Sequence, residues 1–514
     1  MSSAQKTSQS LSVRALWFMA AKTMAFVLNF ALPLILVRRL SQHEFGLYKQ
    51  VFLIVGTAVS VLPLGFGMSA FYFLPREGVN KAHIVLNVIL FYVLIGGAAL
   101  ILLIVDPNVL GAVFNSPDLV AYAPTVGVAI FLWTLASFLE NVVIANQETK
   151  LASVLIVLAQ LTKTILLIAA VFFSASLSAI VYAAIIQGAL QSLVLYIYLK
   201  NRFWRGPFTF SFASLKSQIS YAIPFGIAGL FLRAYADLDS YFVSYKFGPA
   251  LFAVYALGCF ELPLVEILGY SIGSVTIPRI SFLQSVGDTR EIIELVARMS
   301  RKLAAIYFPV YVLMLICAHD LIRFLFTDRY IGSYPVFLIN LTMIPLSLLA
   351  SAYDPVIRAY EGQRYFLVRL RALLTVALVA ALWLGTRYLG LIGAIVAVVS
   401  INMIERIAVS ARACRILGVT RSDWRLVKDL GKIGAASVAA GIVTIVPRLG
   451  LAGAGLFGGV GLFYMLAASG IVYSITYITA LFLFNVPSAE EKGLLRRTAL
   501  LFRLIIMRRQ PDAV

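Results

Sequence analysis

Apolar runs long enough to cross a membrane recur along almost the whole chain, and they limit its possible folds more than any other feature. Lipid accepts only helices or a closed barrel, because every backbone polar group must be bonded within the structure. The runs show no period-two alternation, which excludes barrel strands. The sequence therefore predicts an all-α polytopic membrane protein. Given the length needed to cross about 30 Å of hydrocarbon, we place fourteen transmembrane helices at 15–37, 48–74, 83–104, 120–146, 150–174, 178–199, 217–243, 249–278, 302–326, 334–358, 366–387, 389–411, 431–447 and 453–484.

Composition supports this class of protein. Of the 514 residues, 61% are hydrophobic and only 13% are charged, whereas soluble domains carry about 25% charged residues. The first run, 15–37, is longer than the roughly 7–15 residues of a signal-peptide core and lacks a small-residue cleavage site, so we expect a retained span. Cys259, Cys317 and Cys414 follow neither a disulfide nor a metal-binding spacing. We expect no metal site and no cofactor.

The basic residues indicate an orientation. The net charge of +19 is a value that also occurs in nucleic-acid-binding proteins. If both termini lie in the cytoplasm, however, most of the 42 Lys and Arg residues fall in cytoplasmic connections and few fall in outer ones. This bias follows the positive-inside rule, and attraction to anionic inner-leaflet lipid accounts for the charge. We therefore predict cytoplasmic termini and no nucleic-acid partner.

An internal repeat predicts two related halves. The segment LASFLENVVIANQETK (135–150) aligns with LASAYDPVIRAYEGQR (349–364), which places Glu140 opposite Asp354. In the same way, Phe45-Gly-Leu-Tyr48 answers Phe252-Ala-Val-Tyr255. Spans 1–6 and 7–12 therefore correspond, and an even number of helices per copy gives a pseudo-symmetry axis along the membrane normal.

The repeat sets the expected domain boundaries. We expect a first six-helix lobe at 1–212 and a second six-helix lobe at 213–417. Residues 418–514 then hold two further helices and a basic cytoplasmic tail. The tail, 487–514, is compatible with an amphipathic helix on the inner membrane surface or with a disordered basic end.

Four stretches carry a family resemblance. They are LVRRLSQHEFGLYKQV (36–51), GFGMSAFYFLPRE (65–77), YAIPFGIAGL followed by ADLDSYFVSYKFGPALFAVYAL (within 221–257), and IGSVTIPRIS (272–281). They resemble the polysaccharide transporters, the O-antigen and exopolysaccharide repeat-unit flippases of the multidrug/oligosaccharidyl-lipid/polysaccharide exporter superfamily. The likeness covers spans 1–12.

The resemblance implies a function. Such proteins move an undecaprenyl-pyrophosphate-linked oligosaccharide from the inner to the outer leaflet of the bacterial plasma membrane by alternating access between two lobes. The implied pathways are O-antigen lipopolysaccharide, capsule or exopolysaccharide biosynthesis. The implied partners are the lipid-linked glycan, membrane lipids, and the polysaccharide polymerase with its chain-length machinery.

Three cations lie well inside predicted spans, away from the span ends: Lys22, Lys163 and Arg233. A cationic interior suits an anionic cargo, because a diphosphate pairs strongly with ammonium and guanidinium groups in a low dielectric. Our hypothesis is that Lys22 and Lys163 receive the pyrophosphate and that Arg233 guides the cargo outward. The alternatives are structural. Arg233 and Asp237, at i,i+4, would neutralise each other, and Lys22 would extend its ammonium to the membrane surface.

The acidic candidates are Glu140, Asp354, Glu266 and Asp237. Hydrocarbon disfavours the ionised form of a carboxyl group, so an acid at this depth is suited to carry a proton during antiport. The alternative for Asp354 is an ion pair with Arg358, one turn further along the same helix.

Other functions have weaker support. Asp237-Leu-Asp239 copies the DxD motif of sugar-nucleotide transferases, but it lies at the presumed outer end of a helix. The sequence has neither a glycine-rich phosphate loop nor an HExxH motif, so we expect no enzyme. Two alternatives stay open. One is a small-molecule multidrug cation antiporter, which is expected to use an acid in span 1 where this chain has Lys22. The other is a membrane enzyme or scaffold that does not transport.

Overall fold

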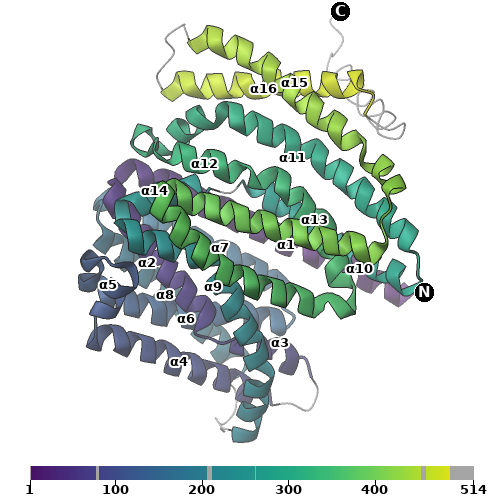
Figure 1. Cartoon of the computed structure of the whole chain (residues 1–514). Helices are drawn as coiled ribbons and strands as arrows, with labels where there is room; N and C mark the ends of the chain where they lie inside the picture. Colours follow the sequence, from purple (N-terminus) through teal and green to yellow (C-terminus); the bar gives the residue numbers. More distant parts are fainter. Residues whose placement is uncertain (1, 77–79, 205–210, 261, 453–458, 487–514) are drawn as a thin grey trace, which may run out of the picture. The chain divides into compact units, whose positions relative to one another are not determined.

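A computed structural model describes residues 2–76, 80–204, 211–260, 262–452 and 459–486. Throughout these residues the regular elements are helices, and no strand occurs among them (Figure 1). The predicted all-α fold is confirmed. The predicted basic tail, 487–514, and the start of the last predicted span lie outside the described residues.

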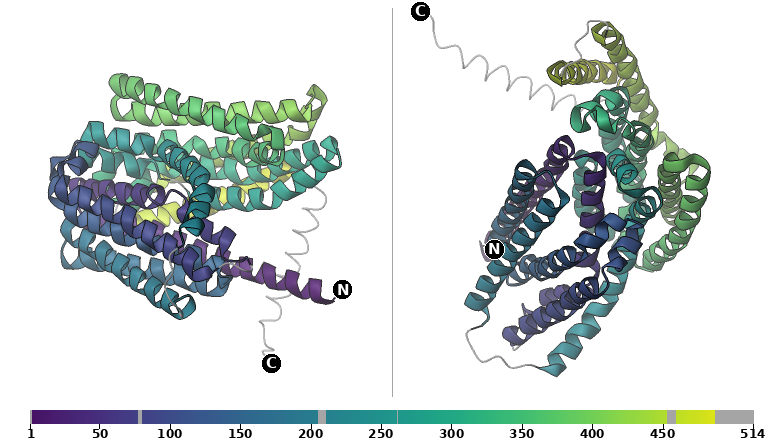
Figure 2. Two further views of the ribbon diagram at one scale, coloured as in Figure 1. Left: turned by 90° about the horizontal axis from the view of Figure 1, so that it is seen from below. Right: turned by 90° about the vertical axis from the view of Figure 1, so that its left-hand side faces the viewer.

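The first of two compact units consists of Met1–Phe260, Leu325–Val336 and Leu378–Val398. Its helices are α1 (Ser2–Arg39), α2 (Gln42–Val61), η1 (Phe66–Met68), α3 (Ser69–Phe73), α4 (Lys81–Val105), α5 (Asn108–Phe114), η2 (Pro117–Tyr122), α6 (Ala123–Ala145), α7 (Thr149–Phe173), α8 (Leu177–Arg202), α9 (Phe212–Gly258) and η3 (Asp328–Tyr330). The beginning of α1 projects past its neighbours in this unit (Figure 2, left). A core of buried side chains that includes Tyr92, Phe138 and Val142 joins α4, α6 and α8.

The second unit consists of Glu261–Phe324, Phe337–Ala377 and Val399–Val514. It contains α10 (Pro263–Ser285), α11 (Thr289–Phe326, whose last two residues fall in the first unit), α13 (Met343–Ala359), η4 (Glu361–Gln363), η5 (Arg421–Val427), α15 (Asp429–Ala452) and α16 (Gly459–Leu483). Two helices, α12 (Ser333–Leu341) and α14 (Arg364–Leu417), have residues in both units. Its core packs α10, α11, α13 and α14 around buried residues such as Ile280, Ile292 and Val356.

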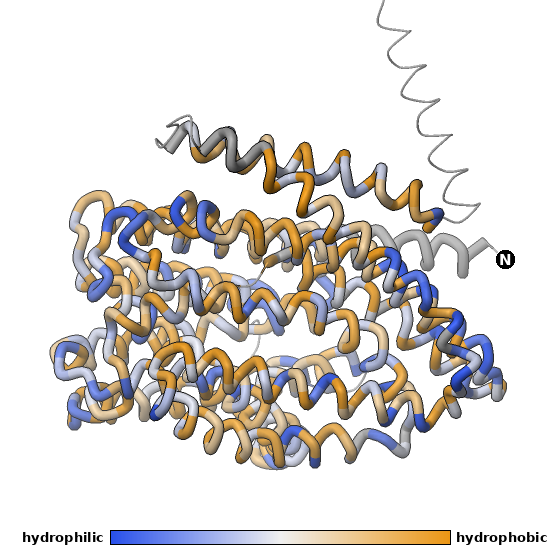
Figure 3. Tube along the Cα trace, turned by 45° about the horizontal axis from the view of Figure 1, so that its top comes forward, coloured by the Kyte–Doolittle hydropathy of each residue, from blue (hydrophilic) through white to orange (hydrophobic). Residues whose placement is uncertain are grey.

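Helices of membrane-spanning character dominate both units. Twelve helical segments in the described residues are long and apolar enough to cross a membrane, and Figure 3 shows them hydrophobic along most of their length, with hydrophilic residues gathered toward the ends. The chain is a multi-pass membrane protein. The sequence predicts fourteen spans, and the difference has a physical reason: α9 and α14 each contain parts of two predicted spans.

Two glycines mark these junctions. Gly390, with φ of 58°, interrupts the 54-residue α14 between the predicted spans 366–387 and 389–411. Gly248, with φ of 74°, does the same in α9. Positive φ costs glycine little, whereas an L side chain rarely adopts it. The predicted spans left residues 244–248 between them at the junction in α9 and only residue 388 at the junction in α14; in the structure a single glycine makes each change of direction.

At Gly390 the chain turns back on itself. A methyl group on Gly393 would lie 1.8 Å from the carbonyl oxygen of Gly385, so the two backbones touch across the turn. Further from the turn, Arg371 Nε lies 2.8 Å from Glu405 Oε1 and joins the two arms. The two arms run side by side in Figure 1, and α14 is therefore a helical hairpin.

Within the first unit, α2 and α9 lie side by side and run in opposite directions. Near one end, a methyl group on Gly46 would lie 1.9 Å from the carbonyl oxygen of Pro249. Near the other end, a methyl group on Gly226 would lie 2.1 Å from the carbonyl oxygen of Leu64. Glycine at both crossings allows the helices to touch along their length. The predicted lobe boundaries at 212 and 417 remain predictions.

The contact across the α14 turn gives a stability prediction. We expect Gly393→Val to lower the free energy of unfolding by about 1–3 kcal/mol, because the added side chain must push the two arms apart. The matched control is Gly97→Val, since nothing lies within 4 Å of a side chain added there. Thermal unfolding of the purified protein in detergent measures both, and equal stability of the two variants would contradict the hairpin packing.

Candidate functional site

A pocket of about 370 Å³ lies within the first unit, with charged and amide side chains set among apolar ones. Its wall comes from α1, α2, α6, α7 and α8, and includes the charged side chains of Lys22, Glu140 and Lys163. The sequence analysis selected the two lysines as cations within spans and Glu140 as a candidate proton carrier, and the structure brings all three into one pocket. Lys22 lies on α1, far along the chain from Glu140 on α6 and Lys163 on α7, so only the tertiary fold brings the three together.

Lys22 and Glu140 form an ion pair across this pocket. The Nζ atom of Lys22, on α1, lies 2.7 Å from Oε1 of Glu140, on α6. Their side chains are 47% and 38% exposed, so the pair is accessible from the pocket rather than sealed in packing. The ring of Phe18 lies 5.5 Å from the same ammonium. Lys22 is thus partnered within the protein and does not need to reach the membrane surface.

Lys163, on α7, is held by aromatic rings. Its Nζ atom lies 5.1 Å from the ring centre of Trp133 and 5.9 Å from that of Phe52. The indole of Trp133 is fixed in turn, because its Nε1–H donates a hydrogen bond of 2.8 Å to the carbonyl oxygen of Ala184. The described residues offer Lys163 no carboxylate within ion-pair distance. With Glu140 balancing Lys22, the charged residues of the pocket leave a net positive charge.

Three glutamines complete the polar wall, and the sequence analysis missed them. Gln187 and Gln191 are one turn apart on α8, and Gln160 precedes Lys163 by three residues on α7. Gln187 is only 3% exposed, and its Oε1 atom has no hydrogen-bond partner among the described residues. Amides at helical spacing in otherwise apolar spans are the signal that would have identified this wall.

Arg233 lies outside this pocket, where α9 meets α2. Its Nε atom is 2.5 Å from Oδ2 of Asp237, and the hydroxyl of Thr57 donates a hydrogen bond of 3.0 Å to the same oxygen. The structural alternative for Arg233, mutual neutralisation with Asp237, therefore describes the observed contact. The pair is only partly buried, with Arg233 37% exposed.

The acids of the second unit have other surroundings. Asp354, on α13, lines a pocket of about 460 Å³ against α10. Its partner is Arg358, at 3.7 Å on the same helix, as the structural alternative expected. Glu266 lies on α10, and its side chain is outside the described part of the chain. The repeat-related Glu140 and Asp354 thus differ in partner.

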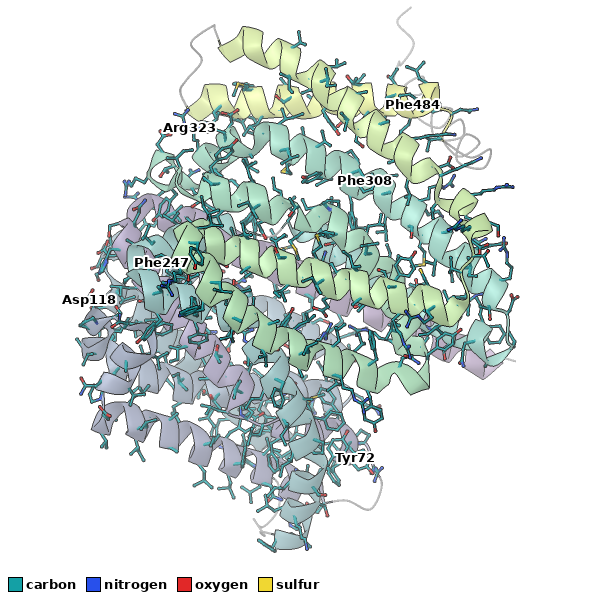
Figure 4. The ribbon with its side chains drawn as sticks, in the orientation of Figure 1. Tyr72, Asp118, Phe247, Phe308, Arg323 and Phe484 are labelled. Carbon is teal, nitrogen blue, oxygen red and sulfur yellow. The ribbon has the colours of Figure 1, made fainter. Side chains whose placement is uncertain are left out.

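At the end of the first unit that the sequence places outside the cell, residues 40–45 contact residues 329–330 of the same unit. Arg329, after α11, donates a hydrogen bond of 3.3 Å to the carbonyl oxygen of Leu40 and accepts one through its own carbonyl from Gln42. The rings of Phe45 and Tyr330 meet edge to face at 5.9 Å. In Figure 4, Asp118 marks this end of the unit and Tyr72 the opposite one.

The described residues contain no group of three or more His, Cys, Asp or Glu side chains placed to hold a metal ion. The chemistry available in the pocket is therefore that of its lysines, its carboxylate and its amides. Two ammonium groups and several amide donors suit the binding of an oxyanion.

The fold can now be compared with those of known proteins. The fold is similar to that of the lipid II flippase MurJ in its inward closed conformation, with a TM-score of 0.70, 13% sequence identity, and coverage of 91% of this chain and 98% of that chain. It is also similar to the Vibrio cholerae MATE transporter VcmN, with a TM-score of 0.51, 16% identity, and coverage of 81% and 100%. An inward-facing multidrug resistance MATE transporter of the MOP superfamily is similar as well, with a TM-score of 0.54, 15% identity, and coverage of 79% of this chain and 98% of that chain.

A search of curated proteins finds no match. The family model described as "Polysaccharide biosynthesis protein" matches residues 35–335, more than half of the chain. This match includes the four stretches that carried the resemblance in the sequence. The chain therefore belongs to the polysaccharide biosynthesis protein family, with the fold of the MOP-superfamily transporters.

Proposed function

We propose that the protein is a flippase that moves an undecaprenyl-pyrophosphate-linked oligosaccharide from the inner to the outer leaflet of the bacterial plasma membrane by alternating access. The observation that carries the proposal is the pocket containing Lys22, Lys163 and Glu140, in a chain of a polysaccharide biosynthesis family. The similarity in fold to a lipid II flippase adds support.

The pocket suits a diphosphate on electrostatic grounds. Lys22 and Lys163 supply two ammonium groups, and Glu140 balances only one of them. A charge in a low dielectric interacts far more strongly than in water, so a net positive pocket inside a bundle favours an anionic head group and disfavours a cation. In the proposal, diphosphate oxygens bind both lysines, and the glutamines donate hydrogen bonds to the remaining oxygens.

Glu140 gives the proposal a coupling step. Its carboxylate holds the ammonium that the diphosphate needs, because Lys22 Nζ lies 2.7 Å from its Oε1 atom. A proton on Glu140 removes that competition and releases Lys22 to the cargo. Asp237, Asp354 and Glu266 remain further candidates for proton coupling, and Asp237 holds Arg233 in the same manner.

Arg233 has a separate role in the proposal. It lies where α9 meets α2, away from the pocket that holds the lysines. We place it on the outward path of the cargo, where the guanidinium exchanges Asp237 for hydroxyl and phosphate groups of the passing glycan. The contacts between residues 40–45 and residues 329–330 then form an outer seal that must open for release.

The finer assignments belong to the same proposal. The glycan is destined for O-antigen lipopolysaccharide, capsule or exopolysaccharide, and the polymerase with its chain-length machinery receives it at the outer leaflet. The principal rival is a multidrug cation antiporter, since MATE transporters share the fold. The net positive pocket argues against that function. A non-transporting membrane enzyme or scaffold would need neither lysine.

The lysines and Arg233 provide the first test. We expect Lys22→Ala or Lys163→Ala to slow translocation about tenfold or more, because each removes a charge-assisted hydrogen bond to the diphosphate, and Arg233→Ala to slow it less. The assay follows a fluorescent polyprenyl-pyrophosphate oligosaccharide across proteoliposomes. Lys216→Ala is the control, since that lysine is exposed at the start of α9. Undiminished translocation after replacement of Lys22, Lys163 and Arg233 together would refute the proposed cargo site.

Glu140 provides the second test. If its proton couples transport, we expect collapse of the proton gradient to slow the unaltered protein and to leave Glu140→Gln unaffected, because the amide cannot titrate. Glu294→Gln is the matched control, since Glu294 is 39% exposed and Glu140 is 38% exposed, and both form ion pairs. The same proteoliposomes report the rate with and without an uncoupler. Coupling is ruled out if the unaltered protein transports equally fast in both conditions.

A further inference from the structure

A second basic site lies in the second unit, where α10, α13 and the first arm of α14 meet. One pocket, of about 460 Å³, is lined by Gly269, Gly273, Asp354 and Arg358 among others. A neighbouring pocket, of about 560 Å³, is lined by Arg358, Tyr360, Arg371 and the apolar residues beside them. Arg358 belongs to both walls, so the two pockets adjoin at its guanidinium.

The guanidinium of Arg358 is available to a ligand. Its nearest acid is Asp354, with Nη2 and Oδ2 3.7 Å apart, which is beyond hydrogen-bond length. The side chain of Arg358 is 53% exposed, and it donates no hydrogen bond to another described residue. A guanidinium carries five N–H donors in a planar fork that matches phosphate oxygens.

A second guanidinium lines the same site. Arg371, on α14, is held through its Nε atom by Glu405, at 2.8 Å, and Glu405 is only 9% exposed. This buried acid fixes the position of Arg371 as part of the pocket wall. The charged residues that line the two pockets are Arg358, Arg371 and Asp354; Glu405, which pairs with Arg371, lines neither pocket.

The pocket floor on α10 is bare backbone. A methyl group on Gly273 would meet nothing within 4 Å, and one on Gly269 would lie 3.3 Å from Ser351 Oγ. Glycines one turn apart therefore leave space for a ligand beside the basic residues.

The rim of the site is apolar, which points to a lipid rather than a soluble anion. Leu367 and Val368 line the second pocket beside Arg358 and Arg371, and Val368 is 66% exposed. Ile357 also lines this pocket, but its side chain is fully buried in the core of the unit. An aliphatic rim next to guanidinium groups suits an amphiphile, whose phosphate binds the arginines while its chain lies on the rim. The site is near the end of α13 that the sequence places on the cytoplasmic side, where lipid head groups are found.

From these contacts, we propose that Arg358 and Arg371 form a binding site for the phosphate of a lipid head group, separate from the Lys22 pocket. Free phosphate or pyrophosphate has the same recognition chemistry, and the test separates the two sources. Lipid binding at this site requires no transport activity of the protein. A negative result for the proposed flippase function would therefore not contradict it, and a negative result here would not contradict the flippase function.

The test measures lipid retained by the purified protein. Native mass spectrometry counts bound phosphatidylglycerol against phosphatidylcholine after exchange into detergent with both lipids. We expect Arg358→Gln and Arg371→Gln each to reduce phosphatidylglycerol retention about tenfold, the effect of losing one hydrogen bond to a charged group. Arg369→Gln is the matched control, because Arg369 is exposed on the same helix and lines neither pocket. Equal retention by all three variants would overturn the proposal.

Two further arms exclude a folding artefact and a soluble ligand. Asp354→Asn removes the acid that opposes the anion, so we expect it to raise phosphatidylglycerol retention, a gain that partial unfolding cannot produce. Inorganic pyrophosphate, at concentrations equal to the lipid, is expected to displace little of it. Displacement of most of the lipid by pyrophosphate would show that the site takes a free anion. Unchanged phosphatidylglycerol retention by Asp354→Asn would show that Asp354 is not part of the site.

Discussion

The cost of placing an ionised side chain in hydrocarbon is the constraint on which this structure most depends. The described charges at membrane depth are met by partners that the fold supplies from nearby helices or from the same helix. Three close acid–base pairs at such depth are Lys22 with Glu140, Arg233 with Asp237, and Arg371 with Glu405. Two of the three join different helices or the two arms of one hairpin. Each such pair therefore fixes helix packing as well as charge.

Lys163 departs from this rule and is informative for that reason. It is held by the faces of Trp133 and Phe52 instead of by a carboxylate. A cation over aromatic rings is stabilised by about 0.5–2 kcal/mol, less than a fully paired buried ion gains. The fold retains an ammonium that it does not neutralise, in a pocket that also contains the unpartnered Oε1 atom of Gln187. Both features cost stability unless a ligand uses them, and the proposed cargo site rests on them.

Much of the fold could be predicted from the sequence, because hydropathy and charge distribution act over single spans. The all-α class and the family followed from such local patterns. The ion pair of Lys22 with Glu140 could not be predicted, since the two residues are 118 positions apart and only tertiary packing brings them together. The turn of α14 was expected within two residues of its place, because the predicted spans 366–387 and 389–411 meet at residue 388. The sequence did not show that a single residue with positive φ, Gly390, makes the turn.

The two acids that align in the sequence repeat, Glu140 and Asp354, have different partners in the structure. Glu140 and Asp354 align in the sequence, and each lines a pocket in its own unit. Glu140 binds a lysine from another helix, which a competing phosphate can take from it. Asp354 lies loosely beside an arginine of its own helix, so a ligand can approach that arginine without breaking a close pair. In the two sites that we propose, an anion would therefore have to displace Glu140 from Lys22 in the first unit, whereas in the second unit it could reach Arg358 without displacing Asp354.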